Sequence, residues 1–179
     1  MMMRKLFLSL PFLLLITACN TGPKQGQPVD NEGITTFYFI RHAEKRLDQG
    51  NDPELTEEGK RRAMAWVNYF FLKNVDHIIS SDYKRTRATA APLAAAHDMD
   101  VEIYDVKTVT GLELLKKYRG KTVALYGHSN TINQYTNALQ NDSVYNALDE
   151  KDYDSYFYVR VSGSGKSSGV KETMDFMEQ

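Results

Sequence analysis

Two histidines and two arginines of the chain stand beside short apolar segments that resemble β-strands. Arg41 and His42 directly follow the apolar residues 36–40, Arg85 lies shortly after the segment 75–80, and His128 follows 122–126. Arginine binds phosphate oxygens in a planar, bidentate geometry, and a neutral imidazole is an available nucleophile near pH 7. If the four side chains converge, they can bind a phosphate monoester and attack its phosphorus.

Convergence requires a fold that brings the ends of separate strands together. Apolar, β-rich segments alternate with helical patterns along the chain, which predicts crossover units and a largely parallel sheet. We expect strands at residues 36–40, 75–80, 101–104 and 122–126, and a closing hairpin of 156–161 and 170–173 around a turn at 162–169. Ligands collect at the carboxyl ends of such strands, where all four residues are expected.

Four helical segments complete the expected α/β fold, a three-layer sandwich with a mostly parallel central sheet and helices on both faces. Thr56 is a suitable N-cap for the first helix, and Glu57 and Glu58 favour its dipole. Its expected buried face consists of Ala63, Trp66, Val67, Phe70 and Phe71. Further helices are expected at 84–97, bent by Pro92, at 112–118 and at 132–139.

Length and charge limit the classes of function. The chain has 179 residues, with 22 basic and 23 acidic side chains and a formal net charge of −1. This length fits one globular domain, and the near-neutral balance argues against a nucleic-acid partner, which would favour a strongly basic surface.

The amino-terminal residues predict export. Residues 1–18 have a positive start, Arg4 and Lys5, followed by an apolar run too short to span a bilayer. The only cysteine, Cys19, ends the sequence LITAC, which resembles the lipobox of bacterial lipoproteins. The resemblance implies a signal peptide at 1–18, a lipid anchor on Cys19, a flexible tether over 19–33, and a domain at 34–179 in the bacterial cell envelope, attached to a membrane. The alternative is an ordinary secretory signal cleaved nearby.

Three motifs carry a more specific resemblance. Residues 41–44 (RHAE) resemble the RHG/RHA signature of the histidine phosphatase superfamily, also called phosphoglycerate mutase-like. Residues 81–89 (SDYKRTRAT) are similar to its S-x-L-x-R-A-x-x-T segment, and 127–130 (GHSN) to its second-histidine segment. The motifs occur in the family's order, each after an expected strand, and the resemblance covers most of 35–139.

The resemblance implies a phosphoglycerate mutase-like fold and a metal-independent phosphatase, without a cofactor, for a small phosphorylated substrate. His42 is then the nucleophile that forms a phosphohistidine, which water hydrolyses. Arg41 and Arg85 bind the phosphate together with Ser129 and Asn130. His128, if protonated, stabilises the charge of the phosphoryl oxygens.

The general acid is left open by the sequence. Related enzymes place a carboxylate after the second histidine, where this chain has Ser129, or on a loop before it. Asp105 is favoured by its position at a strand end, and Glu44 is the rival because it follows the nucleophile. A carboxylate after a strand is also a common turn former, so Asp105 has an ordinary structural explanation.

The remaining histidines and basic residues have ordinary structural explanations. The histidines lack metal-ligand spacing, so a zinc site is not expected. Lys45, Lys84 and Arg87 are expected in solvent, and His77 and His97 in local hydrogen bonds or at a helix end. Loops 46–54 and 140–152 are expected to determine specificity.

Three alternative functions remain beside the phosphatase. One is a module that binds a phosphorylated ligand without hydrolysing it. It is suggested by Ser129, which follows His128 where related enzymes place a carboxylate. The others are mutase-type phosphoryl transfer, which usually needs longer insertions, and a phosphohistidine protein phosphatase, which is usually cytoplasmic.

Overall fold

A computed structural model describes residues 33–175 of the chain. The expected signal peptide, Cys19 and nearly all of the expected tether lie outside these residues. Among residues 33–175, no helix combines the length and apolar character that crossing a membrane would require.

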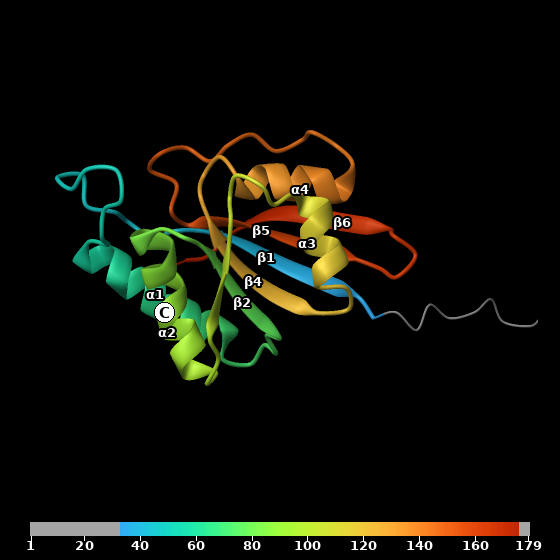
Figure 1. Cartoon of the computed structure of the whole chain (residues 1–179), viewed down its shortest axis with the longest axis horizontal. Coiled ribbons are helices and arrows are strands. Elements are labelled where there is room, and N and C mark those ends of the chain that lie inside the picture. Colours follow the sequence, from blue (N-terminus) through green and yellow to red (C-terminus); the bar gives the residue numbers. More distant parts are fainter. Residues whose placement is uncertain (1–32, 176–179) are drawn as a thin grey trace, which may run out of the picture.

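The sheet has six strands in the order β3-β2-β4-β1-β5-β6 (Figure 1). Its strands are β1 (Thr35–Arg41), β2 (His77–Ser81), β3 (Val101–Tyr104), β4 (Thr122–Gly127), β5 (Ser155–Val161) and β6 (Ser167–Thr173). The first four are parallel to one another, and β5 and β6 form an antiparallel hairpin beside β1. The predicted mostly parallel sheet and closing hairpin are thus confirmed, although β6 begins three residues earlier than expected.

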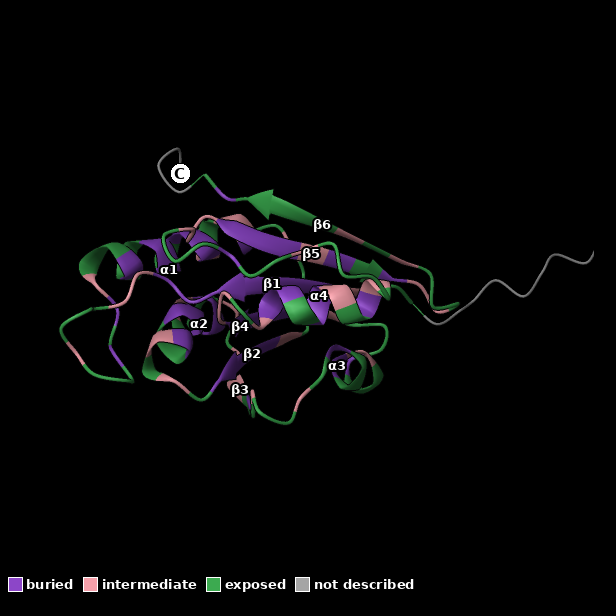
Figure 2. Cartoon of the chain, turned by 90° about the horizontal axis from the view of Figure 1, so that it is seen from above, coloured by how far each residue is buried: buried purple, intermediate pink, exposed green. Residues whose placement is uncertain are grey.

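In the described part of the chain, four helices cover the two faces of this sheet. They are α1 (Glu57–Phe70), α2 (Lys84–Ala96), α3 (Gly111–Lys117) and α4 (Ile132–Gln140). The helices α1 and α2 pack on one face, and α3 and α4 lie on the other (Figure 2). The predicted three-layer α/β sandwich is therefore confirmed.

Within residues 33–175, two large apolar clusters form the core, one on each side of the sheet, and a small third cluster consists of Ala43, Leu55 and Ala63. Along β1, Phe37 and Phe39 belong to the cluster beneath α3 and α4, whereas Tyr38 and Ile40 belong to the cluster beneath α1 and α2. This alternation follows from the two-residue period of a strand, and β1 is buried on both faces because it lies inside the sheet. A strand held in this way fixes the residues at its carboxyl end.

The expected buried face of α1 was wrong at Phe71, and Val67 is only half-buried. Thr56 caps α1 as expected, with its hydroxyl accepting from the amide of Gly59 at 3.0 Å. Trp66 and Phe70 are buried, but Phe71 is 78% exposed. Successive helical residues point about 100° apart, so a side chain next to Phe70 is turned away from the sheet. Phe71 also ends the helix as its C-cap.

Candidate active site

Strand register places the two histidines of the motifs beside each other. In the parallel pair of β1 and β4, Arg41 is the partner of Gly127. The amide of His42 continues the ladder by donating to the carbonyl of Gly127 at 2.9 Å. His42 and His128 therefore leave the sheet at the same level, and their ring centroids lie 5.5 Å apart.

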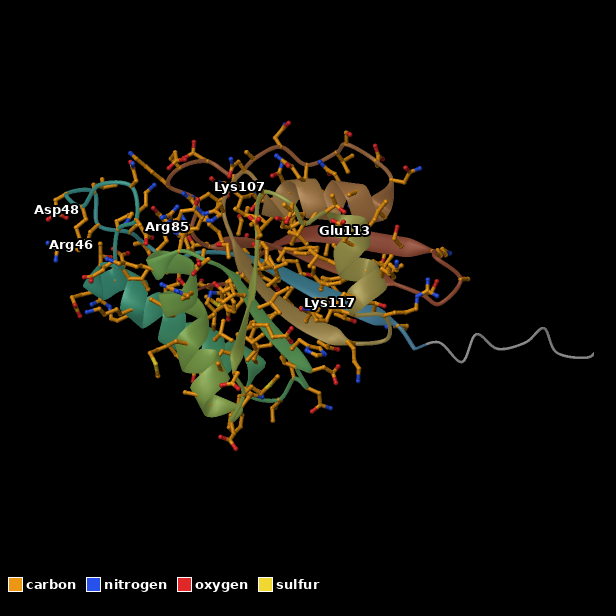
Figure 3. All side chains as sticks on the ribbon, in the orientation of Figure 1. Arg46, Asp48, Arg85, Lys107, Glu113 and Lys117 are labelled. Atoms are coloured by element: carbon orange, nitrogen blue, oxygen red, sulfur yellow. The ribbon has the colours of Figure 1, made fainter. Side chains whose placement is uncertain are left out.

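A cleft of about 470 Å³ opens at these strand ends. It contains the predicted nucleophile His42 and the five residues predicted to bind the phosphate: Arg41, Arg85, His128, Ser129 and Asn130. In Figure 3, Arg85 lies at the end of the sheet nearest the loop that carries Arg46 and Asp48. The other lining residues are Lys45, Tyr83, Val106, Thr131, Ala147, Leu148 and Glu150, of which the last three belong to the loop 140–152 that was expected to determine specificity.

His42 is held in the tautomer that a nucleophile needs. Its Nδ1 lies 2.8 Å from the carbonyl oxygen of Ala43, which only accepts hydrogen bonds, so Nδ1 carries the proton. The lone pair is consequently on Nε2. Burial lowers the pKa of His42 to about 3, and the charges of Arg85, His128 and Arg41 contribute. The imidazole is neutral at pH 7.

His128 has the opposite tautomer. Its Nδ1 lies 3.5 Å from Nη2 of Arg85, which can only donate, so Nδ1 is the acceptor. Nε2–H then donates to the hydroxyl of Ser81 at 3.0 Å, and Ser81 donates to Thr86 at 3.0 Å. This chain of hydrogen bonds fixes the ring. Burial, followed by the charges of Arg85, Lys45 and Arg41, lowers the pKa of His128 to about 4.

Arg41 does more than the phosphate binding expected of it. Nη1 donates to the carbonyls of Asp149 at 2.7 Å and Asp152 at 2.9 Å, and Nη2 donates to that of Glu150 at 3.0 Å. The guanidinium also lies 4.2 Å from the ring centre of Tyr153. Its buried Nε has no hydrogen-bond partner among the described residues. Arg41 therefore fastens the segment 149–153 to the cleft.

Arg85 lies in the first turn of α2, at the opposite wall. Its guanidinium lies 3.7 Å from a carboxylate oxygen of Asp52 and 4.5 Å from the ring centre of Tyr83. Nε of Arg85 also lacks a hydrogen-bond partner within residues 33–175. Two guanidinium groups with free N–H donors thus lie in the same cleft as the two histidines.

Asp105, the expected general acid, is not among the residues that line the cleft. Its carboxylate accepts from the amide of Lys107 at 2.9 Å and forms a turn after β3. It lines a neighbouring hollow with residues that include Asp82 and Ile103. The alternative explanation of Asp105 as a turn former fits the structure, and its assignment as the acid loses its geometric basis.

Glu44, the rival acid, is occupied elsewhere. Nε of Arg62 donates to its two carboxylate oxygens at 2.9 and 3.0 Å, and Nη2 donates to Oε1 at 2.7 Å. Glu44 does not line the cleft either. Among the described residues the carboxylate that does so is Glu150, 77% exposed on the loop that Arg41 fastens.

The structure confirms the expected positions of most of the remaining charged residues and corrects that of Lys45. Lys45 was expected in solvent but lines the cleft. Lys84 is exposed as expected, and Arg87 pairs with Asp82 at 2.8 Å. The local hydrogen bond predicted for His77 is present, because its Nδ1 lies 2.6 Å from Oε1 of Glu102. His97 lies at the end of α2, where it is the C-cap. Within residues 33–175, no cluster of three or more His, Cys, Asp or Glu side chains could hold a metal ion.

The two lowered histidine pKa values predict how stability depends on pH. In the unfolded chain both groups titrate near pH 6.5, so below that pH the unfolded state binds more protons than the folded state. The free energy of unfolding therefore falls as the pH drops from 6.5 towards 4. Between pH 7 and pH 5, His42 is expected to contribute a loss of about 2 kcal/mol. Denaturant titrations of wild type and His42→Asn at both pH values measure it, and equal losses in the two proteins would contradict it.

Comparison with known proteins agrees with this geometry. Residues 37–106 match the model of the histidine phosphatase superfamily (branch 1). The chain is 37% identical over 70 residues to a probable phosphoglycerate mutase of Cronobacter sakazakii. The matched region covers 36% of this chain and 33% of that protein. A counterpart from Escherichia coli strain K12 is 38% identical over 74 residues, covering 38% and 34%. The chain thus spans about a third of the length of the curated relatives it matches.

Solved structures show the same fold over a larger part of the chain. The protein histidine phosphatase SixA, complexed with tungstate, has a TM-score of 0.63 at 15% identity and covers 77% of this chain and 96% of its own. Phosphoserine phosphatase from Entamoeba histolytica, in complex with 3-phosphoglyceric acid, has a TM-score of 0.63 at 16% identity and covers 80% and 99%. At these identities the likeness concerns the fold alone.

Proposed function

The chain belongs to the histidine phosphatase superfamily, and from that premise we propose that it hydrolyses small phosphate monoesters through a phosphohistidine on His42. The observation that carries the proposal is the state of His42. It is neutral at pH 7, its proton is fixed on Nδ1, and it lies in a cleft with two arginines. A neutral ring in this tautomer offers Nε2 to an electrophilic phosphorus.

In the first step the phosphate group binds between Arg41 and Arg85. The free Nε–H of each guanidinium suits a phosphate oxygen, because charge-assisted hydrogen bonds to anions are strong. The dianion also favours protonation of His128, since an opposite charge raises its pKa. A protonated His128 would then stabilise the phosphoryl oxygens in the transition state.

In the chemical step the lone pair of Nε2 forms a bond to phosphorus as the ester P–O bond breaks. The departing oxygen takes the bonding pair and acquires a proton from water in the open cleft. Water then attacks the phosphohistidine, releasing inorganic phosphate and restoring His42. Mutase-type transfer would instead return the phosphoryl group to a substrate hydroxyl.

Hydrolysis of an aryl phosphate tests the function, because its leaving group departs without help from an acid. The purified protein is expected to release inorganic phosphate at the same rate with and without a chelator, since the proposed chemistry uses nitrogen and guanidinium groups. Phosphate release is measured by a colorimetric assay. Loss of turnover on chelation, restored by a divalent cation, would contradict the metal-independent mechanism. Binding of phosphate without any turnover would favour the non-catalytic module.

A further inference from the structure

Two large apolar side chains follow one another in the turn between α1 and β2 and are left exposed. Phe71 is 78% exposed and Leu72 is 90% exposed. Hydrogen bonds hold the backbone on either side of them. The amide of Phe71 donates to the carbonyl of Asn68 at 3.2 Å, and the amide of Lys73 donates to the carbonyl of residue 70 at 2.8 Å. Adjacent exposed apolar side chains on a fixed turn form a candidate contact surface.

This turn lies at the end of the sheet where the parallel strands begin. The amide of Asp76, just before β2, donates to the carbonyl of Thr122 at 2.8 Å. The amide of Thr36 in β1 donates to the carbonyl of Lys121 at 2.8 Å. Figure 1 shows the connection from α1 to β2 at this end of the sheet and the loop 46–54 at the other. We call this end the amino-terminal edge and define it by residues 33–35, 71–76 and 118–121.

The chain enters the domain at the same edge. Ile34, directly before β1, is 46% exposed there. The sequence predicts a lipid anchor on Cys19, and the fourteen residues 20–33 span at most about 50 Å in any conformation. A lipid anchor on Cys19 therefore keeps the amino-terminal edge within that distance of a bilayer.

Other occupants of the edge fit less well than a bilayer. Residues 20–33 contain Val29 as their one large apolar residue apart from prolines, so they are a poor cover for an apolar pair. A stable dimer buries about 800 Å² on each partner, far more than two side chains offer. The charges beside the pair are Lys73 and the ion pair of Lys121 with Asp76 at 3.8 Å. Exposed apolar side chains beside a lysine suit the interface of a bilayer, where the charge stays in water.

We propose that the amino-terminal edge docks on the surface of a lipid bilayer, with Phe71 and Leu72 inserted among the lipids. The proposal rests on the predicted lipid anchor and goes beyond the proposed phosphatase function. An anchor attaches the domain but leaves its rotation free, whereas two inserted side chains fix its orientation. The cleft at the carboxyl ends of the same strands then faces away from the bilayer. The seven residues of β1 place it about 20 Å further from the lipid, where phosphate monoesters reach it from water.

Photo-cross-linking in a bacterium that processes lipoproteins tests the docking. The full chain is expressed with p-benzoylphenylalanine in place of Leu72, and irradiation bonds the benzophenone to C–H groups within its reach, including those of acyl chains. Peptide mass spectrometry measures the lipid adducts. The matched control has the same probe in place of Leu47, which is 89% exposed but lies in the loop 46–54 at the other end of the sheet. We expect at least about tenfold more lipid adduct at position 72 than at position 47.

A second pair of variants tests the contribution of the apolar side chains. Phe71→Ser, in the chain with the probe at position 72, is expected to lower the lipid adduct about fivefold because it removes inserted apolar surface. Met64→Ser is its control, since Met64 is 57% exposed on the same helix but lies outside the amino-terminal edge. Both replaced side chains are exposed, so aryl phosphate turnover should stay within about twofold of the wild type.

Four outcomes would overturn the proposal. They are equal lipid adducts at positions 72 and 47, no lipid adduct at either position, an undiminished adduct in Phe71→Ser, and cross-links from position 72 to protein instead of lipid. In the last case a second copy of the chain or another protein covers the edge. Aryl phosphate turnover by the same preparations tests the proposed function separately, so that each proposal can fail while the other stands.

Discussion

Replacing His42 with alanine is expected to lower the rate of aryl phosphate hydrolysis by at least about 10⁴-fold, while leaving the protein folded. The substitution removes the lone pair that forms the bond to phosphorus. His128, the other histidine among the described residues that line the cleft, is not a comparable nucleophile, because its Nδ1 faces Arg85 and its Nε2–H is donated to Ser81. Steady-state phosphate release measures the effect.

The control for this experiment is His97→Ala. His97 is the C-cap of α2 and does not line the cleft, so its loss should change turnover less than about twofold. Phosphate binding by His42→Ala should persist, since Arg41 and Arg85 remain. A His42→Ala protein that retained a tenth of the wild-type rate would show that His42 is not the nucleophile.

Replacing Arg62 with methionine is expected to lower the free energy of unfolding by about 3 kcal/mol. Arg62 is buried in α1 and donates to Glu44, after β1, and to Asp154, before β5. It thereby joins α1 to the segment that follows β1 and to the segment that precedes β5. Without it, Glu44 remains as a largely buried carboxylate with an unbalanced charge. Removing one partner of a buried ion pair costs more than the pair itself contributes.

Thermal unfolding at pH 7 measures this prediction. A loss of about 3 kcal/mol lowers the melting temperature by roughly 10 °C in a domain of this size. Arg61→Met is the matched control, because Arg61 is the preceding residue of α1 and is exposed. The interpretation fails if both variants melt at the same temperature. Below its melting temperature, Arg62→Met should still hydrolyse the aryl phosphate, since Arg62 does not line the cleft.

The sequence predicts the sheet and the catalytic motifs because these depend on local patterns. Apolar runs determine where β1, β2 and β4 lie, and the parallel order places residues after each strand at one edge. His42, Arg85 and His128 could therefore be assigned to one site without knowledge of any loop. The structure confirms that the cleft contains them.

The residues that the sequence did not identify depend on contacts between distant segments. Arg41 holds Asp149, Asp152 and Glu150 across more than 100 residues, and this fastening brings Glu150 to the cleft. The composition of loop 140–152 carries no signal for such contacts. The loop was expected to influence specificity, but its shape follows from packing against the end of β1 rather than from a local pattern.

Position along the chain does not identify the general acid. Glu44 is two residues from the nucleophile, but a long-range pair with Arg62 directs its carboxylate away from the cleft. Asp105 directly follows β3, but its carboxylate accepts a hydrogen bond from the amide of Lys107 in the turn that Asp105 begins. A carboxylate near a catalytic residue in sequence therefore needs its hydrogen-bond partners to be known before it is given a role.

The most direct test of the account is to trap the phosphorylated protein. The wild type is mixed with an aryl phosphate, quenched in alkali, in which phosphohistidine survives, and analysed by peptide mass spectrometry. The account predicts one phosphoryl group on His42, appearing within the first turnover and absent from His42→Ala. Turnover with phosphate on another residue, such as Ser129, or with no phosphorylated protein at any time, would contradict it.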